Sequence, residues 1–101
     1  LNQLEKVEID VPVAENAKVP KDMQGRRTIT IKEDGQIYLG NRPSELAEVG
    51  PSIREHLKKV PALKIFLRAD KSIEFAEVRE VMKACAEAGA AEIIFATYEK
   101  E

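Results

Sequence analysis

The polar side chains that can do chemistry gather in one short segment, Arg68-Ala69-Asp70-Lys71-Ser72. Residues of these types can hold a partner or a ligand through ion pairs and hydrogen bonds, but they form no recognisable catalytic constellation. A structural role is the stronger interpretation and can coexist with binding: Asp70 closes an Asx turn, Ser72 caps a helix and Arg68 pairs with Asp70. We call residues 68–72 the corner, and we predict that Arg68, Asp70, Lys71 and Ser72 bind a partner.

Two further reactive side chains are better explained by the fold than by chemistry. His56, the single histidine, lies beside the apolar stripe of a predicted helix and has no Cys, His or carboxylate cluster near it in the sequence. We interpret it as a surface helix residue rather than a metal ligand or a base. Cys85 lies on the buried stripe of a second helix and is interpreted as an inert core thiol, because a nucleophilic thiol needs exposure and a lowered pKa. The sequence predicts no enzyme, no metal site and no cofactor.

The composition is that of a small folded protein. The chain has 101 residues, enough for one core, and its 44% hydrophobic and 34% charged residues are ordinary for a globular domain. A formal net charge of -2 without a basic cluster argues against nucleic-acid binding. The single cysteine excludes an internal disulfide and a Cys-based zinc site. No run of 18 or more apolar residues occurs, so no segment of this sequence is predicted to span a bilayer.

The segment from Lys64 to Thr97 has the pattern strand, helix, strand, and it positions the corner. A short run rich in Ile and Phe stands at each end, and an amphipathic helical repeat lies between them. Because the crossover of a βαβ unit makes its two strands parallel neighbours, the corner falls where the first strand ends. That edge of an open α/β sheet is where partners and ligands usually dock. We expect the charged bend to be exposed at the shared tip of the two strands.

A β-hairpin is predicted upstream of this unit, over residues 28–39. A two-residue turn would scatter its aliphatic side chains over both faces of the sheet. A three-residue loop over residues 33–35, with Gly35 left-handed in a bulge, keeps them on one face. Because a slip of one residue flips every side chain, we predict the second register. Its pairs are Ile31 with Ile37 and Ile29 with Leu39.

Two helices are predicted. Residues 40–43 are expected to form a turn, and Ser44 is a fair N-cap for the first helix. Gly50-Pro51 should kink or break this helix, with Pro51 starting its main segment, and Pro61 ends it. The second helix is predicted to end at Gly89, its C-terminal cap. Its buried residues are predicted to be Phe75, Val78, Met82 and Cys85, flanked by Val81 and Ala88.

The N-terminal quarter is predicted to be distinct from the globular part. Residues 7–13 alternate between apolar and polar types, as in a half-buried strand, although Pro12 marks its end or an edge position. Residues 14–27 show no sustained period and are interpreted as a flexible connector. We therefore divide the chain into an N-terminal segment, 1–27, and a globular domain, 28–101. The predicted fold class is α+β: a two-layer domain with a mixed β-sheet and two α-helices on one face, including the C-terminal βαβ unit.

Both faces of the predicted sheet are apolar at its parallel strands. Ile65 and Leu67 point one way while Phe66 points the other, and the last strand repeats this pattern. Right-handed crossovers set both helices on the same face, so the other face needs a different cover. A partner chain, a homodimer or the N-terminal segment can supply it.

Several motifs together carry a family resemblance. The Arg-Ala-Asp-Lys corner with its trailing helix is the most specific of them. Residues 7–14, which include Asp10, Val11 and Pro12, and residues 29–41 extend the likeness upstream. In these segments the sequence resembles the ExbD/TolR family, whose members have a hydrophobic-Leu-Pro segment after the membrane helix where this chain has Val11-Pro12. The corner leans toward the ExbD branch. The other matching positions are Phe75, Val81-Met82, Ala88-Gly89 and Ile93-Ile94.

The resemblance implies a role in the Gram-negative cell envelope. It implies a dimeric domain at the periplasmic face of the inner membrane, anchored in the intact protein by an N-terminal transmembrane helix not present in this chain. With an ExbB/TolQ-like membrane partner, such proteins couple the proton-motive force to outer-membrane transport or envelope maintenance through a TonB- or TolA-like protein. The family's proton-carrying aspartate lies in the membrane helix, so Asp70 is not assigned that role. The alternative is a peptidoglycan- or small-ligand-binding module, since TolR-like members are associated with peptidoglycan.

Overall fold

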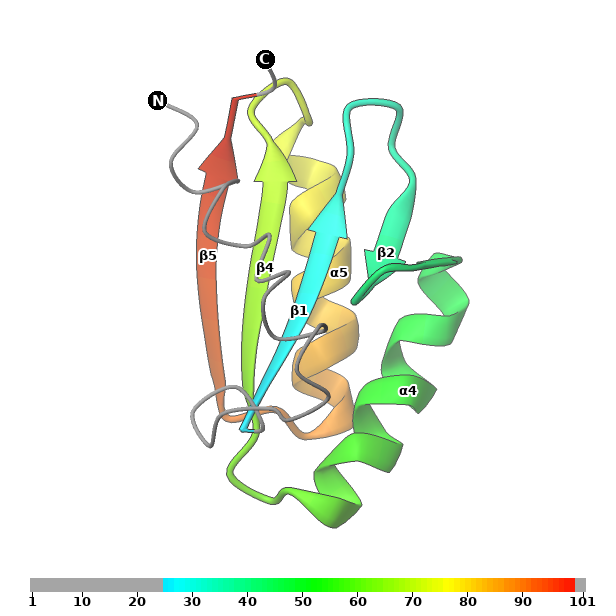
Figure 1. Ribbon diagram of the computed structural model, residues 1–101, viewed down its shortest axis with the longest axis vertical. Coiled ribbons are helices and arrows are strands. Elements are labelled where there is room, and N and C mark those ends of the chain that lie inside the picture. Colours follow the sequence, from blue (N-terminus) through cyan, green and yellow to red (C-terminus); the bar gives the residue numbers. More distant parts are fainter. Residues whose placement is uncertain (1–24, 100–101) are drawn as a thin grey trace, which may run out of the picture.

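The computed structural model describes residues 25–99, which form five strands and two helices (Figure 1). The predicted strand near residues 7–13, with the motif Asp10, Val11 and Pro12, lies outside the described residues. The elements are β1 (Arg26–Ile31), β2 (Ile37–Leu39), β3 (Arg42–Ser44), α4 (Leu46–Lys59), β4 (Lys64–Asp70), α5 (Phe75–Ala88) and β5 (Glu92–Tyr98).

The strands form one mixed sheet in the order β3-β2-β1-β4-β5. β4 pairs in parallel with β1 on one side and with β5 on the other, whereas β2 pairs antiparallel with β1 and β3. The predicted α+β class and the C-terminal βαβ unit, β4-α5-β5, are therefore confirmed. β1 starts two residues before the predicted hairpin, because Arg26 and Arg27 pair with Lys64 and Ile65 of β4. These two residues belong to the sheet and not to a connector.

The β1–β2 hairpin has the predicted register. Ile29 lies opposite Leu39, and Ile31 lies opposite Ile37. The Lys32 N–H donates to the Gln36 carbonyl at 3.0 Å, which closes the three-residue loop. Gly35 has φ 88°, a left-handed conformation that glycine adopts at little cost. The aliphatic residues consequently share one face of the sheet.

The third strand was not predicted. β3 pairs with β2 and contains Pro43, opposite Tyr38, so only Gly40 and Asn41 of the predicted turn stay outside the strands. A proline cannot donate to a ladder, and the sheet accommodates it because β3 is an edge strand. The predicted N-cap Ser44 is wrong, since this residue ends β3 and Glu45 caps α4. The Glu45 backbone N–H donates a hydrogen bond to Oε1 of Glu48 at 2.7 Å.

The predicted break at Gly50-Pro51 is also wrong. α4 is one helix of 14 residues, and Pro51 lies inside it. Pro51 removes only the backbone bond to the carbonyl of Ala47, four residues earlier. Both residues are exposed, so water can satisfy that carbonyl and the helix tolerates the proline. The helix stops at Lys59, before Pro61, as predicted.

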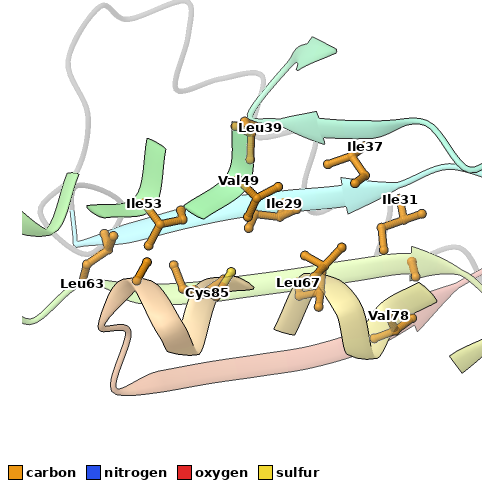
Figure 2. Packing of buried hydrophobic residues seen from close by; sticks show 14 residues of the cluster. Ile29, Ile31, Ile37, Leu39, Val49, Ile53, Leu63, Leu67, Val78 and Cys85 are labelled. Atoms are coloured by element: carbon orange, nitrogen blue, oxygen red, sulfur yellow. The ribbon is translucent and has the colours of Figure 1, made fainter. Parts of the chain in front are cut away.

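Both helices pack on the same face of the sheet (Figure 2). The strand residues of the buried cluster alternate along β1 and β4, so they point to one side. α4 and α5 contribute to this one cluster from above that side. The two-layer arrangement is therefore confirmed. The fully buried side chains are Ile29, Ile31, Val49, Ile53, Leu63, Ile65, Leu67, Val78, Val81 and Cys85.

The buried stripe of α5 differs from the prediction at its first residue. Val78, Val81, Cys85 and Ala88 are buried and Met82 is partly buried, but Phe75 is 52% exposed. Phe75 stands at the helix N-terminus, where its ring meets Phe95 edge-on with centroids 6.2 Å apart instead of entering the core. Gly89 is the C-cap with φ 111°, as predicted.

The face without helices is apolar in part. Phe66 is partly buried beneath the Arg26 guanidinium, which lies 5.6 Å from the ring centroid. Ile94 on β5, opposite Phe66 in the register, is 43% exposed. An exposed isoleucine beside an aromatic ring is a surface that another chain can cover.

The two faces give a direct test of the layer assignment. Ile65→Ala is expected to lower the free energy of unfolding by about 2–5 kcal/mol, because Ile65 is fully buried beneath the helices. Ile94→Ala, the matched change on the neighbouring strand, is expected to lower it by less than about 1 kcal/mol. Equilibrium urea denaturation of the protein at a dilution where it is monomeric measures both values without a contribution from contacts between copies. Equal losses for the two variants would contradict the assignment.

Candidate functional site

The corner is built at the carboxyl end of β4. Side chains alternate along this strand, so Ala69 enters the core while Arg68 and Asp70 lie on the face without helices. Beyond the strand, the Lys71 N–H donates to the Tyr98 carbonyl at 2.8 Å, and the Ile73 N–H donates to the Asp70 carbonyl at 3.0 Å. The backbone of the corner is therefore fixed against the end of β5.

Arg68 joins three neighbouring strands. Its Nη1 donates to Oγ1 of Thr30 on β1 at 3.3 Å, and its guanidinium lies 4.2 Å from the ring centroid of Tyr98 on β5. Arg68 is 5% exposed, Thr30 5% and Tyr98 7%. A guanidinium stacked on an aromatic ring is weakly hydrated and suits such a buried position.

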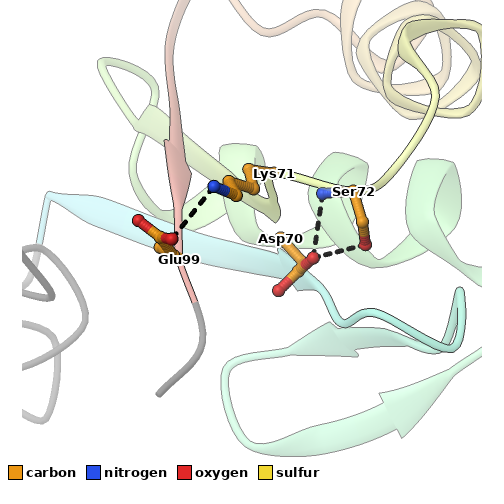
Figure 3. A network of polar contacts seen from close by, with 4 residues as sticks. All are labelled: Asp70, Lys71, Ser72 and Glu99. Atoms are coloured by element: carbon orange, nitrogen blue, oxygen red, sulfur yellow. Dashed lines mark hydrogen bonds and ion pairs between the residues drawn. The ribbon is translucent and has the colours of Figure 1, made fainter.

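Asp70 holds the turn that follows β4 (Figure 3). Its Oδ2 accepts a hydrogen bond from the Ser72 backbone N–H at 2.9 Å and a second one from the Ser72 hydroxyl. The predicted Asx turn is thus confirmed. The predicted helix cap at Ser72 is wrong, because Glu74 is the N-cap of α5 and the Ser72 hydroxyl is used by Asp70.

The exposed part of the corner is smaller than predicted. Lys71 and Ser72 are exposed, as expected, and Lys71 Nζ pairs with Glu99 Oε2 at 2.9 Å. Arg68 and Asp70 are not exposed, because β4 lies between two other strands and both side chains pack over that part of the sheet. A contact with another chain at this tip falls first on Lys71, Ser72 and Glu99. Glu99 was not among the predicted site residues.

Cys85 and His56, which are interpreted from the sequence as structural residues, lie in different surroundings. Cys85 is buried, and burial raises the pKa of its thiol to about 11, as expected of an inert core cysteine. His56 is partly buried rather than simply on the surface, and its Nδ1 lies 3.0 Å from Nη1 of Arg27. Burial, followed by the charges of Arg27 and Lys59, lowers the pKa of His56.

Two grooves of opposite charge lie on the surface of the domain, and neither was predicted. The acidic groove, of about 410 Å³, has an apolar floor that includes Ile31 and Val81. The basic groove, of about 660 Å³, lies beside α4. Residues from separate elements meet in both, so no local sequence signal marks them. The acidic groove is lined by Asp34, Glu45, Glu77 and Glu80. The basic groove is lined by Arg27, Arg42, His56 and Lys59, together with Glu48 and Glu55.

Metal and membrane signals are not found in the described part of the chain. Over residues 25–99, no group of three His, Cys, Asp or Glu side chains is arranged to hold a metal ion. Within the same residues, neither helix has the length and apolar character needed to cross a bilayer.

The described residues form a small α+β domain with one mixed sheet, two helices and a charged tip. The family described as biopolymer transport protein ExbD/TolR matches residues 1–100, and the chain belongs to this family. Its members are membrane-associated accessory proteins of biopolymer transport that work in complexes with other proteins. No curated protein matches the chain. The match does not separate the ExbD branch from the TolR branch, so the branch stays a prediction.

The hydrogen bonds of Asp70 predict its effect on stability. Asp70→Ala is expected to lower the free energy of unfolding by about 1–3 kcal/mol, because two donors of Ser72 lose their acceptor. Lys71→Ala, the adjacent control, removes only an exposed ion pair and is expected to cost less than about 1 kcal/mol. Urea denaturation compares the two variants. If the Asp70 variant is as stable as the Lys71 variant, Asp70 does not hold the turn.

Proposed function

We propose that this chain is the periplasmic domain of an ExbD/TolR-like inner-membrane protein that helps couple the proton-motive force to outer-membrane transport or envelope maintenance. In this proposal the domain acts through contacts with other proteins and carries out no reaction. An ExbB/TolQ-like protein binds the membrane helix of the intact protein, and the domain contacts a TonB- or TolA-like protein. Membership of the family supports the accessory role.

One observation supports a partner contact at the corner: an exposed pair of charged residues, the tip, lies next to a buried pair, the base. Arg68 and Asp70 form the base and are only 5% and 4% exposed. Lys71 and Glu99 form the tip, with side chains 61% and 62% exposed. An exposed ion pair contributes only about 0–1 kcal/mol, so exchanging it for a pair with a partner costs little. The base keeps both tip residues in position during that exchange.

Charge reversal at the tip tests the contact. In the intact protein produced in Gram-negative cells, Lys71→Glu is expected to lower growth that depends on outer-membrane transport by about tenfold, because it repels the carboxylate that Lys71 is proposed to meet. Lys58→Glu is the matched control, since Lys58 is 67% exposed and also forms a single ion pair, with Glu55 at 3.0 Å. This variant should grow as the unchanged protein does.

The result distinguishes the proposed function from its competitor. Equal growth of the two variants would contradict a partner contact at the corner. Calorimetric titration of both variants with purified peptidoglycan fragments supplies the second comparison. If Lys71→Glu lowers that affinity and leaves transport-dependent growth unchanged, the chain is a peptidoglycan-binding module instead.

The proposed partners include a second copy of the chain. Ile94, 43% exposed, lies beside Phe66 on the face that no helix of the described residues covers. Sedimentation velocity is expected to give the mass of a dimer for the chain and of a monomer for Ile94→Glu, because a carboxylate cannot be buried in an apolar contact without a partner. A monomer for both proteins would contradict a dimer formed through this face.

A further inference from the structure

The basic groove lies at the opposite end of the sheet from the corner. Arg27 stands near the start of β1, where this strand pairs with the start of β4, whereas the corner follows the end of β4. Arg42 reaches the groove from β3, and His56 and Lys59 reach it from the last turns of α4. The groove is therefore a separate surface, and its role is independent of the one proposed for the corner.

Arg27 is held in the groove by neutral groups. Its Nη2 donates to Oγ of Ser52 at 2.9 Å, and its Nη1 donates to Nδ1 of His56 at 3.0 Å. A guanidinium cannot accept a hydrogen bond, so His56 accepts through an unprotonated Nδ1 and its ring is neutral. Within the described residues Arg27 makes no ion pair. Its orientation is fixed, but its charge is not balanced by these contacts.

The neighbouring charges repel one another. Burial, and after it the charge of Arg42, lowers the pKa of Arg27, and the charges of Arg27 and Lys59 contribute to the lowered pKa of His56. Burial contributes most to both shifts, and the nearby like charges add to it. Repulsion among these side chains costs free energy, and an anion placed between them would lower that cost.

The carboxylates that line the groove already have partners. Glu48 Oε1 accepts the Glu45 backbone N–H at 2.7 Å at the start of α4. Glu55 Oε2 pairs with Lys58 at 3.0 Å on the outer face of the same helix. The groove thus combines cations that lack a carboxylate, among the described residues, with carboxylates that are engaged elsewhere.

We propose that the basic groove binds a carboxylate carried by a peptide, with Arg27 and Arg42 as its hydrogen-bond donors. A guanidinium matches the planar carboxylate with two parallel donors. Ala47 and Pro51 provide an apolar wall for the rest of the peptide. The lining has three cations, Arg27, Arg42 and Lys59, and two carboxylates, which leaves a single positive charge. A carboxylate balances that charge, whereas a phosphate group carries nearly two negative charges.

Titration of the chain with matched peptides tests the proposal. The probes are acetyl-Ala-Glu-Ala-amide, its neutral twin acetyl-Ala-Gln-Ala-amide, acetyl-Ala-Ala-Ala with a free carboxyl terminus, and inorganic phosphate, all at constant ionic strength. Backbone amide signals in nuclear magnetic resonance spectra report where and how tightly each one binds. The Glu peptide or the free carboxyl terminus is expected to bind at the groove at least about tenfold more tightly than the Gln peptide. The tighter of the two identifies a side chain or a chain terminus as the source of the carboxylate.

A variant pair separates the groove from general charge. Arg42→Gln removes an exposed donor that makes no side-chain hydrogen bond within the described residues, so the fold and the contacts of Arg27 remain. It is expected to weaken carboxylate binding by about tenfold. Arg54→Gln removes the same charge from an exposed position of α4 outside the groove lining, and it is expected to change binding by less than about twofold.

The titration of His56 gives a second measurement. A carboxylate bound beside Arg27 offsets the repulsion on His56, so the pKa of its imidazole should rise when the acidic peptide is added and stay unchanged with the Gln peptide. Three results would overturn the proposal: equal binding of the Glu and Gln peptides, signals that change away from the groove, or phosphate bound more tightly than either carboxylate. Equal weakening by the Arg42 and Arg54 variants would overturn it as well.

Discussion

The structure depends on β4 being paired on both sides. Its parallel bonds to β1 and β5 fix which side each of its residues faces, and they do so along its whole length. Ile65, Leu67 and Ala69 face the helices and are buried. A shift of one residue would turn Arg68 and Asp70 into the apolar layer, where neither could be accommodated. The register of one strand therefore sets both the core and the corner.

Arg68 can be buried because the same register supplies its partners. Thr30 lies directly opposite it on β1, and Tyr98 stands opposite Asp70 on β5. The hydroxyl of Thr30 accepts a hydrogen bond, and the ring of Tyr98 receives the face of the guanidinium. A single side chain thus ties three strands together at the end where the chain leaves the sheet.

Much of the fold follows from local patterns in the sequence. The aliphatic residues of the hairpin are compatible with only one register, and Gly35 provides the backbone conformation that this register requires. Spacing also predicts α5 and its cap at Gly89. The apolar stripe of α5 shows which side of the helix faces the sheet. It does not show whether the layer above and below the first helical residue is complete, and for this reason the prediction of a buried Phe75 is wrong.

The missed features have in common that they form between distant residues. β3 has three residues and a proline, too few to show a period, and it exists because β2 offers it an edge. Arg27 contacts Ser52 and His56, which are 25 and 29 positions away. β2 and β3 separate Arg27 from α4 in the sequence. No spacing rule predicts a contact between a strand residue and a helix that lie so far apart in the chain. The corner can be predicted because its residues are consecutive, and the basic groove cannot because its residues are dispersed.

Adjacent residues of the corner have different roles. Asp70 points into the turn and holds it, whereas Lys71, next in the chain, points to solvent and pairs with Glu99. Loss of Asp70 therefore changes the geometry of every residue near it, and a loss of transport in such a variant says little about direct contact. Reversal of Lys71 removes the exposed ion pair with Glu99 but leaves the backbone bond to Tyr98, which does not involve the side chain. A substitution of the exposed Lys71 therefore tests the proposed partner contact more directly than a substitution of Arg68 or Asp70, the buried residues that position it.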